Sequence, residues 1–163
     1  MTDKGRAEPK APTGAPLSAT RLAAVPMLAG AGVLIGSWVA ASIFVGPQLD
    51  LGPRRTELEF ADHVLPGAVV IVICLAVVLA LVVGKRFRPA APSLLFYAGL
   101  GISLAGVWTT ATHVPLILQA FRDQAPWPAA LNYSIPAFLM LLFGIGWCSL
   151  YRGPFAEPDE PKP

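Results

Sequence analysis

The stretch 64-VLPGAVVIVICLAVVLALVV-83 decides the fold of this chain, because twenty consecutive residues carry no charged side chain. About 20 helical residues are needed to cross a hydrocarbon core of about 30 Å. Lipid offers no partner to an unpaired N–H or C=O group, so a segment of this kind crosses a bilayer as an α-helix. A transmembrane β-barrel would instead show alternating segments of roughly ten residues.

Three further apolar runs lie on either side of this stretch. The four predicted spans are about 22–45, 64–83, 93–121 and 128–151. The sequence therefore predicts an all-α, integral membrane four-helix bundle over residues 22–151. The remaining segments 1–21 and 152–163 are rich in proline and charge, which predicts disordered tails.

Composition supports a membrane protein and excludes some partners. The chain is 55% hydrophobic and 13% charged, which is too apolar for a soluble domain of 163 residues. A net charge of +2, with basic residues dispersed among tails and loops, gives no basic face for nucleic acid. The expected partners are the lipid bilayer itself and a membrane-protein partner or a second copy of the chain. The first span is longer than a signal-peptide core and is expected to stay uncleaved.

The distribution of basic residues predicts the orientation in the membrane. Nine of the twelve lysines and arginines lie in the two tails and the second loop: Lys4, Arg6, Lys10, Arg21, Lys85, Arg86, Arg88, Arg152 and Lys162. The first and third loops contain only Arg54, Arg55 and Arg122. Both termini should therefore be cytoplasmic.

A ridge of small residues in the first span indicates close helix packing. Gly32, Gly36 and Ala40 recur every four residues and share one helix face. Such a ridge lets another helix backbone approach closely. The partner helix can belong to the same chain or to a second copy, and the pattern serves both uses.

Polar side chains gather toward the predicted outer leaflet. They are His63, Thr109, Thr110, Thr112, His113, Asn132, Tyr133 and Ser134. Unpaired polar groups are costly in hydrocarbon, so these residues should converge on one another or on an outward-facing pocket. The candidate catalytic residues are His113, Tyr133, Asn132, Thr109 and Thr110.

His113 has two interpretations. It can act as a general acid or base near neutral pH. Alternatively it is structural and donates a hydrogen bond to a carbonyl that Pro115 leaves without its helical partner, which would be that of Ala111.

The ligand pattern for a metal is weak. Glu59 and His63 share a helix face at i, i+4 spacing, and His113 lies at a comparable depth on another span. No dense motif such as H-E-x-x-H accompanies them. We therefore predict no metal and no cofactor, with His63, His113 and Glu59 as the candidates if a metal binds. Cys74 and Cys148 lie at different depths and predict no disulfide.

Two segments resemble a known family. Residues 36–53 read GSWVAASIFVGPQLDLGP, and residues 107–121 read VWTTATHVPLILQAF. They resemble the small four-span bacterial membrane proteins that include the anthrone oxygenase-like proteins. The matching positions are Phe44, Pro47, Leu49, Val114, Pro115 and Leu116. The resemblance implies oxidation of a flat aromatic or quinone-like molecule within the membrane. The expected location of the protein is the bacterial inner membrane.

Two functions follow from these observations. The sequence favours an accessory or structural membrane protein, which can be part of a larger membrane complex. The alternative is a membrane-embedded oxidoreductase that acts on a lipophilic aromatic or quinone-like substrate in the outward-facing pocket. A transporter is disfavoured because the spans carry no central charge and no broken-helix repeat.

The orientation can be tested with compartment-sensitive reporters. Green fluorescent protein should fluoresce when fused to either terminus, because both ends are predicted to be cytoplasmic. Alkaline phosphatase should be inactive at the same positions and active when inserted beside Arg54 in the first loop. An active phosphatase at the C-terminus would exclude the four-span topology.

Overall fold

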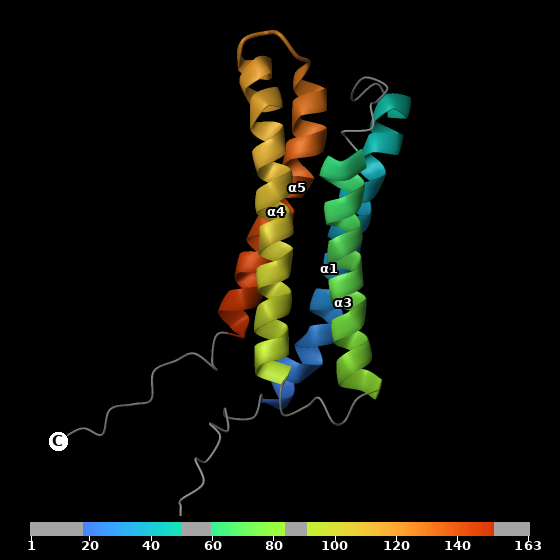
Figure 1. Ribbon diagram of the computed structural model, residues 1–163, viewed down its shortest axis with the longest axis vertical. Coiled ribbons are helices and arrows are strands. Elements are labelled where there is room, and N and C mark those ends of the chain that lie inside the picture. Colours follow the sequence, from blue (N-terminus) through green and yellow to red (C-terminus); the bar gives the residue numbers. More distant parts are fainter. Residues whose placement is uncertain (1–17, 50–59, 84–90, 152–163) are drawn as a thin grey trace, which may run out of the picture.

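The computed structural model describes residues 18–49, 60–83 and 91–151; Glu59 and most of the two predicted tails lie outside them. Four long helices run antiparallel to their chain neighbours (Figure 1). They are α1 Ala19–Val45, α3 Leu65–Val83, α4 Ala91–Phe121 and α5 Trp127–Leu150. A 3-10 turn, η1 (Gly46–Leu49), follows α1, and one π-helical turn, η2 (Phe60–Val64), leads into α3.

The helix ends follow from local chemistry. α1 begins at Ala19, three residues before the predicted start, because the Ser18 hydroxyl accepts a hydrogen bond from the Arg21 N–H at 3.3 Å. Pro128 stands in the first turn of α5, where a missing N–H breaks no helical bond. We call the end of the bundle that holds Ala19 the proximal end and the end that holds Trp127 the distal end.

All four helices are long and apolar enough to cross a membrane. Large apolar side chains cover their outer surfaces; Met27 is 79% exposed and Leu34 is 73% exposed. A soluble monomer rarely shows so continuous an apolar surface. In lipid the same surface is solvated, and each helix satisfies its own backbone hydrogen bonds. The described part of the chain is thus all-helical and is built as a four-helix membrane bundle.

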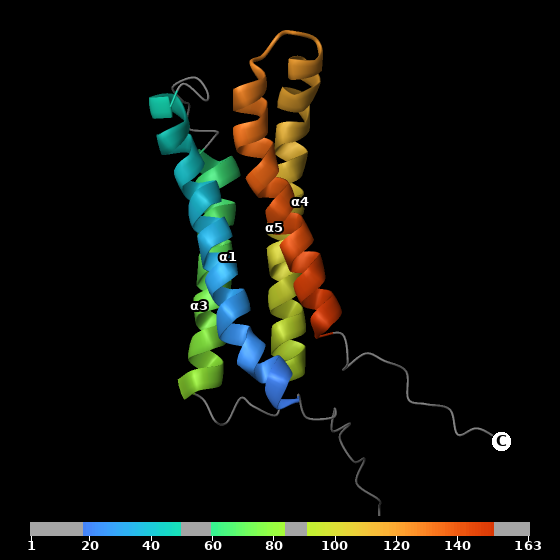
Figure 2. The ribbon, with the colours of Figure 1, turned by 180° about the vertical axis from the view of Figure 1, so that it is seen from behind.

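Glycines bring the helices together as two tight pairs (Figure 2). In the α4–α5 pair, a Cβ atom at Gly106 would lie 2.5 Å from the Leu141 backbone, and one at Gly144 would meet the Ser103 backbone. In the α1–α3 pair, a Cβ at Gly36 would lie 2.7 Å from the Gly67 carbonyl oxygen. Only residues without a Cβ allow backbones to approach this closely.

The small-residue ridge of α1 packs within the chain. Gly32 lies against the Cys74 sulfur of α3 and the Phe143 ring of α5. Gly36 and Ala40 both lie against Gly67. The described residues therefore use this ridge to hold α1 against its neighbours in the same molecule.

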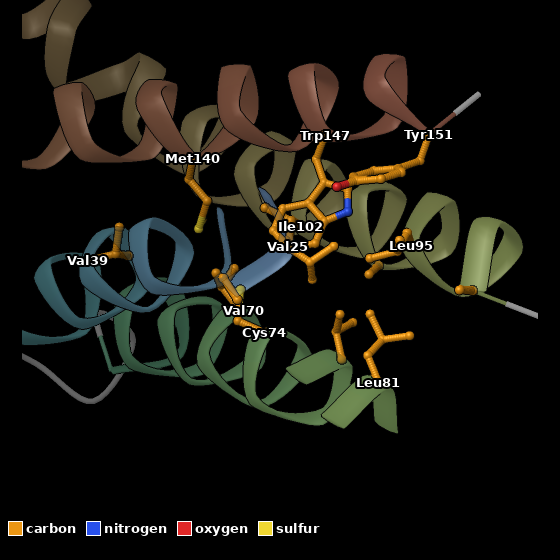
Figure 3. Packing of buried hydrophobic residues seen from close by; sticks show 14 residues of the cluster. Val25, Val39, Val70, Cys74, Leu81, Leu95, Ile102, Met140, Trp147 and Tyr151 are labelled. Carbon is orange, nitrogen blue, oxygen red and sulfur yellow. The ribbon is translucent and has the colours of Figure 1, made fainter. Parts of the chain in front are cut away.

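The two pairs share one apolar core in the proximal half and centre of the bundle (Figure 3). Val25, Cys74, Ile102 and Trp147 each come from a different helix and are all buried. At the proximal end, the hydroxyl of Tyr151, just after α5, donates to the Arg21 carbonyl of α1 at 3.0 Å. Both cysteines are free thiols.

The glycine contacts can be tested with a matched pair of variants on α1. Gly36→Ala should destabilise the fold by about 1–3 kcal/mol, because the new methyl group meets the α3 backbone. Gly30→Ala is the control, since nothing lies within 4 Å of a Cβ at that position. Unfolding in detergent micelles measures both variants. Equal stability of the two would contradict the packing of α1 on α3.

Candidate functional site

Three ionisable side chains from three different elements meet in the distal third of the bundle. His63 comes from η2, His113 from α4 and Tyr133 from α5. The His63 and His113 ring centroids are 4.5 Å apart, and His63 and Tyr133 are 5.1 Å apart, both in edge-to-face geometry. The His113 and Tyr133 rings are 6.0 Å apart. We call these three residues the His–His–Tyr cluster.

The local backbone explains how His63 enters the cluster. The π-helical turn η2 adds a residue to the turn that precedes α3, and π turns of this kind occur frequently at functional sites. Within this turn His63 is only 2% exposed, whereas Phe60 and Ala61 are exposed. The turn therefore directs the one ionisable ring inward and the apolar side chain of Phe60 outward.

The ring of His113 is fixed by a helix carbonyl. Its Nδ1 lies within hydrogen-bonding distance of the Thr109 carbonyl oxygen, one turn earlier on α4. A carbonyl oxygen only accepts, so Nδ1 is the donor and carries the hydrogen. The lone pair of the neutral ring is then on Nε2, which makes this nitrogen the basic atom. The carbonyl is that of Thr109 and not that of Ala111, which the position of Pro115 had indicated.

The threonines support this arrangement. Thr109 is fully buried, and its hydroxyl donates to the Ala105 carbonyl at 2.9 Å. The hydroxyl of Thr112 donates to the Thr109 carbonyl at 3.0 Å and lies 3.2 Å from Nδ1 of His113. Thr110 is half-buried, and its hydroxyl has no hydrogen-bond partner among the described residues. Thr109 thus holds His113 in place, while Thr110 does not contribute to that network.

Gly46, directly after α1, lies against both Tyr133 and Asn132. A Cβ atom at Gly46 would lie 2.6 Å from the Tyr133 hydroxyl and 3.0 Å from Nδ2 of Asn132. The end of α1 therefore brings a bare backbone against both side chains. The sequence reasoning did not select Gly46. A glycine directly after an apolar span, followed by Pro47, is the signal that was available.

A pocket of about 290 Å³ lies between α1 and α5 beside Asn132. Its other lining residues are Trp38, Pro128, Leu131, Ile135 and Pro136. Trp38 is half-exposed and forms the α1 side of the pocket.

The ligand set for a metal is incomplete in the described residues. The structure brings His63 and His113 together, but no group of three His, Cys, Asp or Glu side chains forms within residues 18–49, 60–83 and 91–151. The third candidate, Glu59, lies outside these ranges.

Comparison with known proteins adds no relative: no family model, no curated protein and no solved structure matches this chain. The resemblance to the anthrone oxygenase-like proteins therefore stays a prediction.

The contact at Gly46 predicts a steric effect on the cluster. Gly46→Ala should displace the Tyr133 hydroxyl or the Asn132 amide, since the backbone φ of −53° suits any residue and the only obstacle is contact. The chain contains two histidines, so NMR of ring-labelled histidine reports on His63 and His113 alone. Their signals should shift in Gly46→Ala and stay unchanged in Gly30→Ala. Unchanged signals in Gly46→Ala would place Tyr133 away from α1.

Proposed function

We propose that this protein is a multi-pass protein of the bacterial inner membrane with both termini cytoplasmic. The excess of lysine and arginine in the tails and second loop supports this orientation. The first residue of α1 and the last residue of α5 lie at the same end of the bundle, as a four-span chain requires. In this orientation the distal end, with the His–His–Tyr cluster, is in the outer leaflet.

We further propose that the His–His–Tyr cluster exchanges a proton with a lipophilic molecule that dissolves in the membrane. The observation that carries the proposal is the contact between two imidazoles and a phenol from three separate elements, all buried within an apolar bundle. Ionisable groups within membrane spans are rare and mark functional sites by default. Clusters of such groups are also a recurrent feature of catalytic sites.

A purely packing role does not explain why the side chains of the cluster are polar. Apolar side chains of similar volume would fill the same space without the desolvation of three polar rings. Elsewhere in the bundle the chain fills its core with residues of that kind, such as Val25, Ile102 and Met140. The exception in the distal third therefore calls for a chemical role.

The fixed ring of His113 supplies that role. With Nδ1–H donated to the Thr109 carbonyl, Nε2 is the atom that accepts a proton from a bound hydroxyl group. The proton returns to the substrate from the same nitrogen, so the exchange leaves the protein unchanged. The rings of His63 and Tyr133 lie beside the His113 ring, with centroids 4.5 Å and 6.0 Å away. An accessory role in a larger complex stays a prediction from the sequence.

The proton exchange can be tested with two probes of one shape in lipid nanodiscs. 2-Naphthol carries an exchangeable proton, and 2-methoxynaphthalene does not. We expect 2-naphthol to shift the ring signals of labelled His63 and His113 toward those of the protonated rings, because the two rings are 4.5 Å apart and a proton on one ring affects the signals of both. The methoxy compound should leave the protonation state unchanged. Identical responses to both probes would refute proton exchange.

His113→Asn is the matched variant for this experiment. The amide of asparagine can still donate to the Thr109 carbonyl, so the helix contact is kept, but it cannot take up a proton. The variant should fold with near-normal stability, and the response of His63 to 2-naphthol should be lost or strongly reduced. A full response of His63 in this variant would show that His113 has no part in the exchange.

A further inference from the structure

A larger pocket, of about 770 Å³, lies between α1 and α3 in the proximal half of the bundle. Its floor includes Ala29 and Cys74, which are buried, and its rim includes Leu34 and Leu79, which are exposed. The pocket is therefore a groove on the outer surface of the bundle, and we call it the α1–α3 groove. Its full lining is Pro26, Ala29, Gly30, Val33, Leu34, Cys74, Leu75, Val78 and Leu79.

Two residues of α1 explain why the groove exists. Pro26 has no N–H group for the Leu22 carbonyl, and a proline inside a helix bends it. Toward its first residue, α1 runs away from α3 (Figure 2) and joins α5, where the Tyr151 hydroxyl donates to the Arg21 carbonyl. Gly30 leaves the space between α1 and α3 open, because nothing lies within 4 Å of a Cβ atom at this position.

The lining of the groove selects an apolar occupant. Apart from the thiol of Cys74, every side chain in the lining is apolar, so the groove offers no charge and no strong hydrogen bond. Both helices are long and apolar enough to cross a membrane, which places the groove in the hydrocarbon layer. The chains of membrane lipids reach this position directly, whereas polar molecules dissolved in water do not.

The groove is too short to hold a second protein chain. On α1 its lining extends from Pro26 to Leu34, which is about 12 Å at 1.5 Å per residue. A crossing helix is roughly 30 Å long, so less than half of a partner helix would lie in the groove. A stable protein interface uses about 20–30 residues from each partner, and the groove is lined by nine. A flexible acyl chain, by contrast, can follow a short groove.

Charges near the groove complement a phosphate head group. Arg21 precedes Pro26 by five residues in the sequence, and Lys85, Arg86 and Arg88 follow α3. Basic residues beside a membrane surface attract anionic head groups by about 1 kcal/mol each. Phospholipids of the leaflet at the proximal end are therefore drawn to this end of the bundle by their head groups, while the groove takes up only a chain.

We propose that the α1–α3 groove binds one acyl chain of a phospholipid from the leaflet at the proximal end. The chain lies beside Gly30, against Ala29 and Cys74, and fills the space between α1 and α3. A ligand that binds only the folded state raises the free energy of unfolding, so the phospholipid stabilises the proximal half of the bundle. The groove includes no residue of the His–His–Tyr cluster, and this site is independent of proton exchange.

The unaltered protein decides the proposal. Native mass spectrometry counts the lipids that stay bound when the protein is released from nanodiscs of palmitoyl-oleoyl phosphatidylglycerol. We expect one phospholipid to remain at a collision energy that removes all others. A lipid-free monomer, or a gradual loss with no preference for one lipid, would overturn the proposal. A lipid-free dimer would also overturn it, because a second copy would then cover the groove.

Two matched glycine variants assign the phospholipid to the groove. Gly30→Leu places a side chain in the groove and should lose the retained phospholipid. Gly146→Leu is the control, because Gly146 is exposed on α5, lies outside the lining and also has nothing within 4 Å of a Cβ atom. This variant should keep the phospholipid. Equal retention by the two variants would remove the groove as the binding site.

Unfolding in detergent micelles gives a second readout. Added phosphatidylglycerol should raise the stability of the unaltered protein and of Gly146→Leu, because the lipid binds the folded state. In Gly30→Leu the added leucine occupies the groove, so the increase should be lost. Equal increases in all three proteins would show that the lipid acts through the micelle and would contradict a site between α1 and α3.

Discussion

A hydrocarbon solvent supplies neither hydrogen-bond donors nor acceptors, and every feature of this structure is arranged around that constraint. It requires each crossing segment to close its own backbone as a helix, which explains why the described elements are helical. It also removes the hydrophobic effect as a force between helices, since lipid chains are as apolar as leucine. Close contact between backbones must then provide cohesion, and the glycines at Gly36, Gly67, Gly106 and Gly144 allow it.

The same constraint explains where chemistry is possible. Two tight helix pairs leave the distal third of the bundle as the place where η2, α4 and α5 meet with polar side chains. The main cluster of buried apolar side chains does not include any residue of the His–His–Tyr cluster. Separation of this kind lets one part of the molecule provide stability while another tolerates the desolvation of imidazole and phenol rings.

Features that depend on composition and on depth in the membrane could be predicted from the sequence. Features that depend on the local path of the backbone could not. Twenty uncharged residues around Cys74 suffice to predict a crossing helix, and the depth of His63, His113 and Tyr133 suffices to predict that they converge. The π-helical turn at η2 and the approach of Gly46 to Tyr133 depend on a register shift and on a crossing angle between helices, and neither has a sequence period. The sequence also did not reveal the Thr109 carbonyl as the partner of His113. Pro115 lacks an N–H group, so it leaves the carbonyl of Ala111 without its helical partner, and that carbonyl was the one expected.

The hydrogen bond from the Tyr151 hydroxyl to the Arg21 carbonyl joins residues 130 positions apart in the chain, at the start of the first helix and just beyond the last. During synthesis the ribosome releases Arg21 long before it reaches Tyr151. The first helix is therefore made before the other three, and it can form this hydrogen bond only after the last helix has been made. Only the final residues of the bundle complete this junction, so a chain truncated before Tyr151 lacks the hydrogen bond that joins the first and last helices at the proximal end.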